Sequence, residues 1–182
     1  MGSDICGPFP ILALGGYKYF ITFLDFTTRW LEVRLLRARS DALAVFRDTK
    51  ALLENQSKSG SKLRRLRTDN AKEYTSAAFQ KLLAESGIKH ELSAPYTPQQ
   101  NGLAERINRT LLIRLGLMLF QANAPKTLWR EALLAAVFIY NCSPHSYLQF
   151  KTPMKHVGIW AVGVGEVASG SSLVQLLRSI PE

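Results

Sequence analysis

The pattern of apolar and polar residues predicts a sheet whose strands are interspersed with helices. Segments rich in aromatic, β-branched or alternating residues predict strands at 17–24, 30–36, 62–68 and 88–94. Apolar residues at helical spacing predict helices at about 41–56, from a cap at Thr75 or Ser76 to Gly87, from about 102 to beyond 118, and at 128–141. Strands and helices that mix along one chain indicate an α/β domain.

The longest predicted helix carries an apolar stripe along one side. Its members recur every three or four residues: Leu103, Ile107, Leu111, Leu115 and Met118. Glu105 lies about 135° from the middle of this stripe, and Arg109 follows one turn later on the same side. We therefore expect Glu105 to point away from the core. Arg114 falls near the edge of the stripe. The pattern explains it only as a side chain whose aliphatic part packs on the apolar stripe while its charged end reaches solvent.

Size and composition indicate one folded domain. The chain has 182 residues, enough to bury about two-thirds of its unfolded surface. Its hydrophobic content is 47% and its charged content is 20%, which is typical of a soluble globular protein. The 23 Lys and Arg residues outnumber the 14 Asp and Glu residues. The resulting net charge of +9 favours a polyanionic partner.

Membrane and extracellular classes are not indicated. The longest apolar run, residues 132–140, is shorter than the roughly 20 residues that a membrane span needs. The N-terminal residues do not resemble a signal peptide. Cys6 and Cys142 form neither a disulfide framework nor a zinc-binding pair by their spacing. These features predict a soluble intracellular protein with no membrane association. Separately, no small-molecule substrate is expected.

Three acidic residues are candidate metal ligands. Asp4 lies near the N-terminus, Asp69 ends the predicted strand 62–68, and Glu105 follows after 35 intervening residues. Carboxylates on separate elements can hold Mg²⁺, which takes oxygen ligands and keeps waters or phosphate oxygens. Simpler interpretations exist for two of them, because Asp69 could cap a turn through its side chain and Glu105 could be an acid favoured in the first turn of a helix.

Two segments resemble a known family. Residues 67–70 read RTDN and residues 95–106 read PYTPQQNGLAER. They resemble the catalytic core of copia-type retrotransposon integrases, whose pattern is two aspartates, 35 residues and a glutamate. The resemblance extends over about residues 4–153. It implies a ribonuclease H-like α/β fold, with a mixed five-stranded sheet flanked by helices and Asp4 in the central strand. It also divides the chain into a catalytic core, 4–154, and a divergent C-terminal tail, 155–182.

The resemblance implies a function and a cofactor. Asp4, Asp69 and Glu105 would be both the catalytic residues and the ligands of Mg²⁺ or Mn²⁺, with two ions bound. The chain would act in DNA integration as a metal-dependent polynucleotidyl transferase and endonuclease, on retrotransposon DNA ends and target DNA. Two ions can activate the attacking oxygen of a phosphodiester displacement and stabilise the departing one. Family membership would also imply a nuclear location and self-association into a homo-oligomer.

The resemblance and the charge pattern together predict DNA-binding residues. Two basic residues lie near Glu105, polar residues form the loop before it, and further candidates lie around Asp69. The set is Arg109, Arg106, Gln99, Gln100, Asn101, Asn70, Lys62 and Arg64. Phosphate contacts of this kind do not depend on DNA sequence and weaken with salt. For the basic residues before Asp69 a solvated strand face is an equal alternative, and residues 99–102 could form only a turn and a helix entry.

One departure from the family pattern favours a rival hypothesis. Ala71 stands where the family usually has glycine, and an alanine forced to a positive φ would cost roughly 1 kcal/mol or more. Together with the divergent tail, it points to a decayed or domesticated copy or to a truncated gene product. Such a chain would be a non-catalytic module that binds nucleic acid or a protein. A ribonuclease H-type enzyme that cleaves RNA is a third alternative, which the loop at 95–102 disfavours.

Overall fold

A five-stranded mixed sheet forms the centre of the molecule. The structure is a computed structural model that describes residues 1–56, 60, 62–93 and 98–157, without the side chains of 98–101. The strands are β1 (Gly2–Cys6), β2 (Tyr19–Leu24), β3 (Leu31–Leu36), β4 (Arg65–Thr68) and β5 (Lys89–Leu92). Their order across the sheet is β3-β2-β1-β4-β5. Strand β1 is antiparallel to β2 and parallel to β4, so the central strand joins the two halves.

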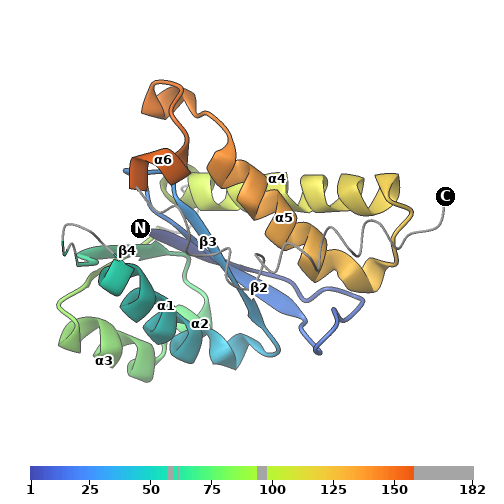
Figure 1. Ribbon diagram of the computed structural model, residues 1–182. Helices are drawn as coiled ribbons and strands as arrows, with labels where there is room; N and C mark the ends of the chain where they lie inside the picture. The colour runs from blue at the N-terminus through green and yellow to red at the C-terminus, as the bar shows by residue number, and fades with distance from the viewer. Residues whose placement is uncertain (57–59, 61, 94–97, 158–182) are drawn as a thin grey trace.

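Helices cover both faces of this sheet, as Figure 1 shows. On one side lie α1 (Ala42–Gln56), α2 (Lys72–Thr75) and α3 (Ala77–Glu85). On the other side lie α4 (Pro98–Gln121) and α5 (Trp129–Cys142), which pack against each other and are followed by the short α6 (Pro153–Val157). Short 3-10 helices occur at Arg39–Asp41, Lys126–Leu128 and Ser146–Leu148.

Two apolar cores form because side chains alternate along the strands. Phe20 and Leu24 of β2 pack with Ile107 and Leu111 of α4 on one face. Ile21 and Phe23 of β2 pack on the other face, in a core that contains Phe46 of α1 and Phe79 of α3. Because both faces of β2 are buried, its sequence reads as a nearly continuous apolar run.

Most predicted elements are present, with shorter strands. Of the two predicted helix caps, Thr75 and Ser76, the structure has Ser76. The helix begins at Ala77, and the Ser76 Oγ accepts a hydrogen bond from the Phe79 N–H at 3.3 Å. It ends before Gly87, whose φ of +65° lies in the left-handed region. Strand β4 begins at Arg65, so the predicted strand start at residue 62 is wrong. Among the described helices, none is long and apolar enough to cross a membrane.

The start of the long helix also differs from the prediction. Helix α4 begins at Pro98, four residues before the start expected from the sequence. Proline suits the first helical position because its φ is already helical and its missing N–H has no partner there in any case. Residues 99–101 are therefore helical in their backbone, and the prediction of a loop through residue 101 is wrong. Their side chains lie outside the described part of the structure.

Candidate active site

Asp4 occupies the middle of the central strand. In β1 it pairs with Thr22 of β2, and its side chain is partly buried beneath α4. One carboxylate oxygen, Oδ2, accepts a hydrogen bond from the Asn108 Nδ2 at 2.9 Å. Burial raises the pKa of Asp4 to about 6, and the negative charges of Asp69 and Glu105 contribute in the same direction. Asp69 and Glu105 therefore each lie within electrostatic range of Asp4.

Asp69 follows the last residue of β4. Strands β1 and β4 run parallel and pair Gly2 with Arg67, and Asp4 and Asp69 each lie two residues further along their segments. The Asp69 Oδ1 accepts a hydrogen bond from the Ala71 N–H at 3.1 Å, which closes a small turn. The turn-capping role considered from the sequence is thus present. It occupies Oδ1, and it does not exclude the use of the carboxylate as a ligand.

Ala71 does not strain this turn. Its φ is −60° and its ψ is 144°, an extended conformation that any residue adopts. The sequence-based expectation that an alanine here would be costly applies only to a positive φ, so it does not hold for this conformation. The substitution therefore gives no support to a decayed copy.

Glu105 lies in the part of α4 that passes over the central strand. Its side chain is exposed, on the side of α4 away from the buried Ile107 and Leu111, as its position on the helical wheel predicts. Asn108, one turn further along α4, makes the contact with Asp4. Glu105 is thereby held close enough to raise the pKa of Asp4 through its charge.

The donor set fits a divalent cation, although the side chains do not form a closed ligand shell. Among the described residues, no group of three His, Cys, Asp or Glu side chains is close enough to hold a metal ion as it stands. Nevertheless, the pKa of Asp4 is raised by burial first and then by the negative charges of Asp69 and Glu105, so both carboxylates act on Asp4. A hard cation takes oxygen ligands of this kind and would offset their repulsion.

Asn108 is a site residue that the analysis of the sequence did not assign. Its side chain is 5% exposed, its Nδ2 holds Asp4, and its Oδ1 has no hydrogen-bond partner among the described groups. The spacing contains a signal, because a residue three positions after Glu105 lies on a neighbouring part of the same helix face. What the sequence alone does not reveal is that this face meets β1 at Asp4.

A second missed group lies behind Asp69. The Gln80 Nε2 of α3 lies 2.8 Å from the His90 Nδ1, and the His90 Nε2 lies 2.8 Å from the Thr68 Oγ1. An amide nitrogen donates, so the histidine accepts at Nδ1 and donates from Nε2. The Thr68 hydroxyl in turn donates to the backbone carbonyl of Asp69 at 2.9 Å. Burial lowers the pKa of His90, which favours this neutral form.

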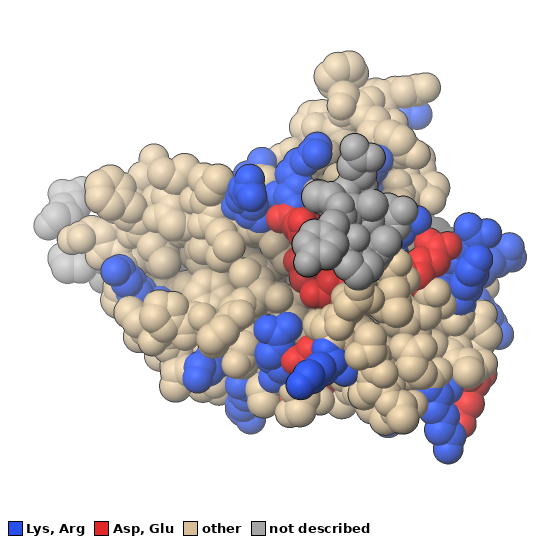
Figure 2. All heavy atoms as spheres, turned by 180° about the vertical axis from the view of Figure 1, so that it is seen from behind, with Lys and Arg blue, Asp and Glu red and all other residues tan. Residues whose placement is uncertain are grey.

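The predicted DNA-binding residues are dispersed around the acidic residues. Arg106 and Arg109 are exposed on α4, near Glu105. Asn70 is exposed, but its Nδ2 donates to the Ser93 backbone carbonyl at 3.0 Å, so this amide also has a structural role. On the face seen in Figure 2, acidic side chains lie near the middle of the molecule, with basic side chains on several sides of them.

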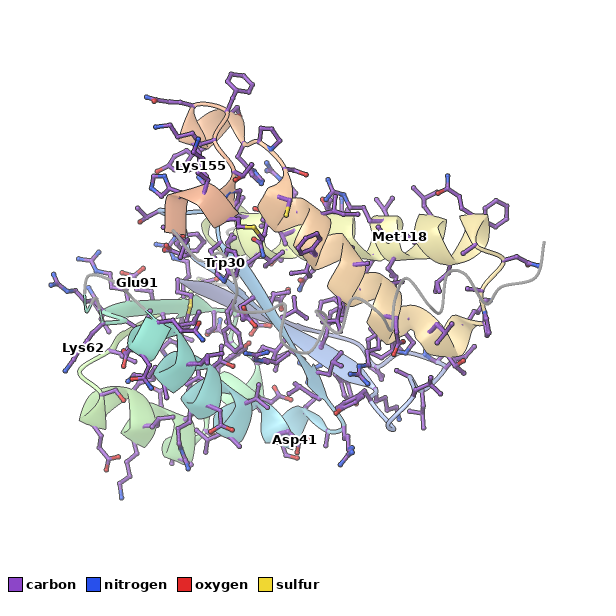
Figure 3. The ribbon with its side chains drawn as sticks, in the orientation of Figure 1. Trp30, Asp41, Lys62, Glu91, Met118 and Lys155 are labelled. Atoms are coloured by element: carbon purple, nitrogen blue, oxygen red, sulfur yellow. The ribbon has the colours of Figure 1, made fainter. Side chains whose placement is uncertain are left out.

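The other predicted contacts are more distant from this group or fall outside the description. Lys62 and Arg64 are exposed in the segment before β4. Figure 3 shows Lys62 at the end of the molecule where Glu91 of β5 also lies. Gln99, Gln100 and Asn101 have side chains outside the described residues. Their role in binding DNA remains a prediction, as does the role of the basic residues.

Comparison with known protein families shows to which family this chain belongs. Residues 1–98 match a family described as integrase core domain, and residues 86–153 match a second family with the same description. The chain belongs to the integrase core domain family. This is the integrase core of Ty1/copia-type retrotransposon Pol polyproteins, as the sequence motifs predicted. The family is one of catalytic cores, whose members are enzymes.

Several relatives are polyproteins of transposons. A retrovirus-related Pol polyprotein from transposon TNT 1-94 of Nicotiana tabacum is 44% identical over 151 residues, which are 83% of this chain and 11% of the relative. The corresponding polyprotein from transposon RE2 of Arabidopsis thaliana is 34% identical, over 80% of this chain and 10% of the relative. A truncated transposon Ty1-A Gag-Pol polyprotein of Saccharomyces cerevisiae is 31% identical, over 86% and 13%. The integrase core thus spans about a tenth of these polyproteins.

A solved structure has the same fold. A chain in the cryo-EM structure of the simian T-cell lymphotropic virus intasome in complex with PP2A regulatory subunit B56 gamma superposes with a TM-score of 0.67 at 22% identity. The match covers 88% of this chain and 54% of that chain. The predicted ribonuclease H-like fold, with its mixed five-stranded sheet, is therefore confirmed. The boundary between a core at 4–154 and a tail at 155–182 stays a prediction.

Proposed function

We propose that this integrase core acts in DNA integration, as a metal-dependent polynucleotidyl transferase and endonuclease on retrotransposon DNA ends and target DNA. The observation that carries the proposal is the electrostatic convergence of Asp69 and Glu105 on Asp4, in a chain whose family is one of integrase cores. These residues lie far apart in the sequence: Asp4 is in β1, Asp69 directly follows β4 and Glu105 is in α4.

In this proposal Asp4, Asp69 and Glu105 are the catalytic residues and hold Mg²⁺ or Mn²⁺, with two ions in the working enzyme. Such ions supply Lewis acidity, which activates a water or a 3′-hydroxyl and stabilises the leaving oxygen of a phosphodiester. Asn108 keeps the Asp4 carboxylate in one orientation through its hydrogen bond. The Ala71 N–H fixes Asp69 through Oδ1 and leaves Oδ2 with no hydrogen bond among the described residues.

DNA is the proposed partner, contacted through the basic residues near the carboxylates. Arg106 and Arg109 are exposed on the same helix as Glu105, and the net charge of +9 favours a polyanion. Gln99, Gln100, Asn101, Asn70, Lys62 and Arg64 complete the proposed contact set. Self-association and action in the nucleus belong to this proposal too. The solved chain that shares the fold belongs to an intasome, and a comparable assembly is proposed for this chain.

The direct test removes one carboxylate at a time without changing side-chain shape. Asp69→Asn and Glu105→Gln should reduce Mg²⁺-dependent nicking of a labelled DNA duplex to background, because a neutral amide is a poor ligand for a hard cation. The matched control is Glu85→Gln, which neutralises an exposed carboxylate at the end of α3. Circular dichroism should show all three variants folded like the parent.

Two outcomes would contradict the proposal. Nicking by Asp69→Asn at the rate of the parent would remove Asp69 from the metal site. A parent protein that binds the duplex but never nicks it, with Mg²⁺ or Mn²⁺ present, would favour the rival hypothesis of a non-catalytic nucleic-acid-binding module.

A further inference from the structure

The loop between α5 and α6 exposes two aromatic side chains. Tyr147 is 64% exposed and Phe150 is 78% exposed. Figure 1 shows this segment, in orange, projecting away from the sheet. A single exposed aromatic residue needs no explanation, but neighbouring ones on a projecting segment indicate a contact surface. Each ring can remove a large apolar area from water when a partner covers it.

Hydrogen bonds within the loop hold it in one conformation. The His145 carbonyl accepts from the N–H groups of Leu148 and Phe150, at 3.0 and 2.9 Å. The His145 N–H in turn donates to the Lys151 carbonyl at 3.1 Å, which closes the loop on itself. Leu148 is 7% exposed and anchors the loop in the interior. The two rings are therefore carried by an ordered segment with its own internal contacts.

The backbone of this loop is strained where it turns. Gln149 and Phe150 have φ values of +52° and +61°, although neither is a glycine. The left-handed region brings the Cβ of an L-residue too close to its own backbone, so two such residues in succession are unfavourable. Strained conformations persist where the surrounding contacts hold them, and they cluster at sites that bind or react. Here one of the two strained residues is the exposed phenylalanine itself.

The surroundings of the two rings are positively charged. The Arg29 Cζ lies 3.9 Å from the centre of the Tyr147 ring, so a guanidinium lies against this ring. Lys151 belongs to the loop and Lys155 lies in α6, as Figure 3 shows, while residues 132–157 contain no Asp or Glu. In the described part of the chain, none of these three cations forms an ion pair. The charge of this surface therefore favours an anionic partner.

We propose that this loop binds single-stranded DNA, with Tyr147 and Phe150 stacking on unpaired bases. Arg29, Lys151 and Lys155 contact the phosphates. Every base has an aromatic face on which a ring can stack, and the backbone beside it carries the matching negative charge. Bases inside a duplex are already stacked on each other, so the rings select unpaired ones. The inference rests on the proposed function only for the choice of DNA, and the site needs no metal.

The first experiment measures binding of a fluorescein-labelled oligothymidine strand by anisotropy, with EDTA present. Phe150→Leu keeps an apolar side chain and removes the ring, so it should bind this strand about tenfold more weakly than the parent. Phe120→Leu is the matched control, because Phe120 of α4 is 84% exposed, and it should bind like the parent. Binding of a labelled duplex should be the same for both variants and the parent.

An added tryptophan gives a readout that a purely structural role would not change. Phe150→Trp should bind oligothymidine as tightly as the parent, since the larger ring also stacks. Its fluorescence in excess of that of the parent should be quenched when the strand binds. Phe120→Trp should show no additional quenching. This pair of variants also keeps the test decisive if Phe150→Leu does not fold.

Several results would overturn the proposal. Oligothymidine that does not bind the parent, or binds Phe150→Leu equally well, would show that no stacking site exists. A Phe150→Leu variant that keeps its affinity for the strand but loses self-association in sedimentation would identify the loop as a contact between copies of this chain. Oligouridine bound much more tightly than oligothymidine would assign the loop to RNA.

The salt dependence tests the charged part of the site. Lys151→Met should lower the slope of log affinity for oligothymidine against log salt by about 0.7, because one phosphate contact is lost. An unchanged slope would overturn the phosphate contact assigned to Lys151. Asp69→Asn should bind oligothymidine like the parent, so a failure of the proposed catalytic function can be told apart from a failure of this site.

Discussion

At the scale of single residues, the carboxylate cluster depends on a neutral side chain. Asn108 donates to Asp4 from Nδ2, while its Oδ1 stays without a partner among the described groups. An asparagine in this position adds no charge to three acids that already repel one another. It can hold Asp4 in one rotamer whether or not a cation is present, which makes it a positioning residue for the proposed metal site.

This role leads to a prediction for Asn108→Leu, which keeps the side-chain volume and removes both polar atoms. Nicking should fall by about 10–100-fold, the usual effect of losing a partner of a metal ligand. The Mg²⁺ concentration that gives half of the maximal rate should rise as well, because Asp4 would have to be oriented by the ion itself. Both quantities come from nicking rates measured over a Mg²⁺ titration.

The Mg²⁺ titration also separates positioning from a general structural role. A variant that is merely less stable would lose rate at every Mg²⁺ concentration without a shift in the half-maximal point. Parent-like rates and an unshifted titration would show that the hydrogen bond to Asp4 has no part in catalysis.

At the scale of elements, a side chain near the end of α5 bonds the backbone of the edge strand β3 at Leu31. Strand β3 is an edge strand, and at Leu31 its outward N–H and carbonyl would lack strand partners. The Asn141 side chain, 4% exposed, supplies an acceptor for the N–H and a donor for the carbonyl. One side chain thus replaces a neighbouring strand at this position.

Asn141→Ala should therefore destabilise the protein strongly. Two buried backbone groups would be left unpaired, at a cost of roughly 1–3 kcal/mol each. Urea unfolding should show a loss of about 2–5 kcal/mol in the free energy of unfolding. Asn55→Ala, at an exposed position of α1, is the control and should be neutral or slightly stabilising, because alanine is the better helix former. Equal effects of the two substitutions would show that water replaces the Asn141 amide at no cost.

The sequence predicted those helices and strands whose limits depend on local patterns of capping and apolar residues. The Ser76 cap and Gly87 delimit α3, and the apolar stripe from Leu103 to Met118 marks the buried side of α4. The start of α4 at Pro98 was missed because the polar residues after it resemble a loop, although proline favours a helix start. The partners of Asp4 and Thr68 were not predictable, since Asn108 and His90 reach them through tertiary packing and strand register.

At the scale of the whole molecule, the fold brings together acids that the sequence separates. Strand β1 pairs with β4 in parallel and contacts α4, and the charges of Asp69 and Glu105 both act on Asp4. Their repulsion destabilises the folded state when no cation is bound. A cation that binds only the folded protein should therefore stabilise it by mass action.

Mg²⁺ should raise the unfolding temperature in a way that EDTA reverses. For a dissociation constant of about 1 mM, about 10 mM Mg²⁺ stabilises by roughly 1.4 kcal/mol. A domain of this size would then unfold about 3–5 °C higher by calorimetry. Glu105→Gln should abolish most of the shift, while Glu85→Gln should keep it. If the unfolding temperature of the parent is the same with and without Mg²⁺, this result would argue against a metal site at this cluster, independently of any activity assay.

A chain of hydrogen bonds connects Gln80 of α3, through His90 and Thr68, to the backbone carbonyl of Asp69. It crosses from α3 to the strand end without passing over the face that carries Arg106 and Arg109. A small molecule that broke the bond between Gln80 and His90 would therefore act on the backbone of Asp69 from the α3 side of the sheet. Such an inhibitor would act without competing for nucleic acid, and its potency would not fall as the DNA concentration rises.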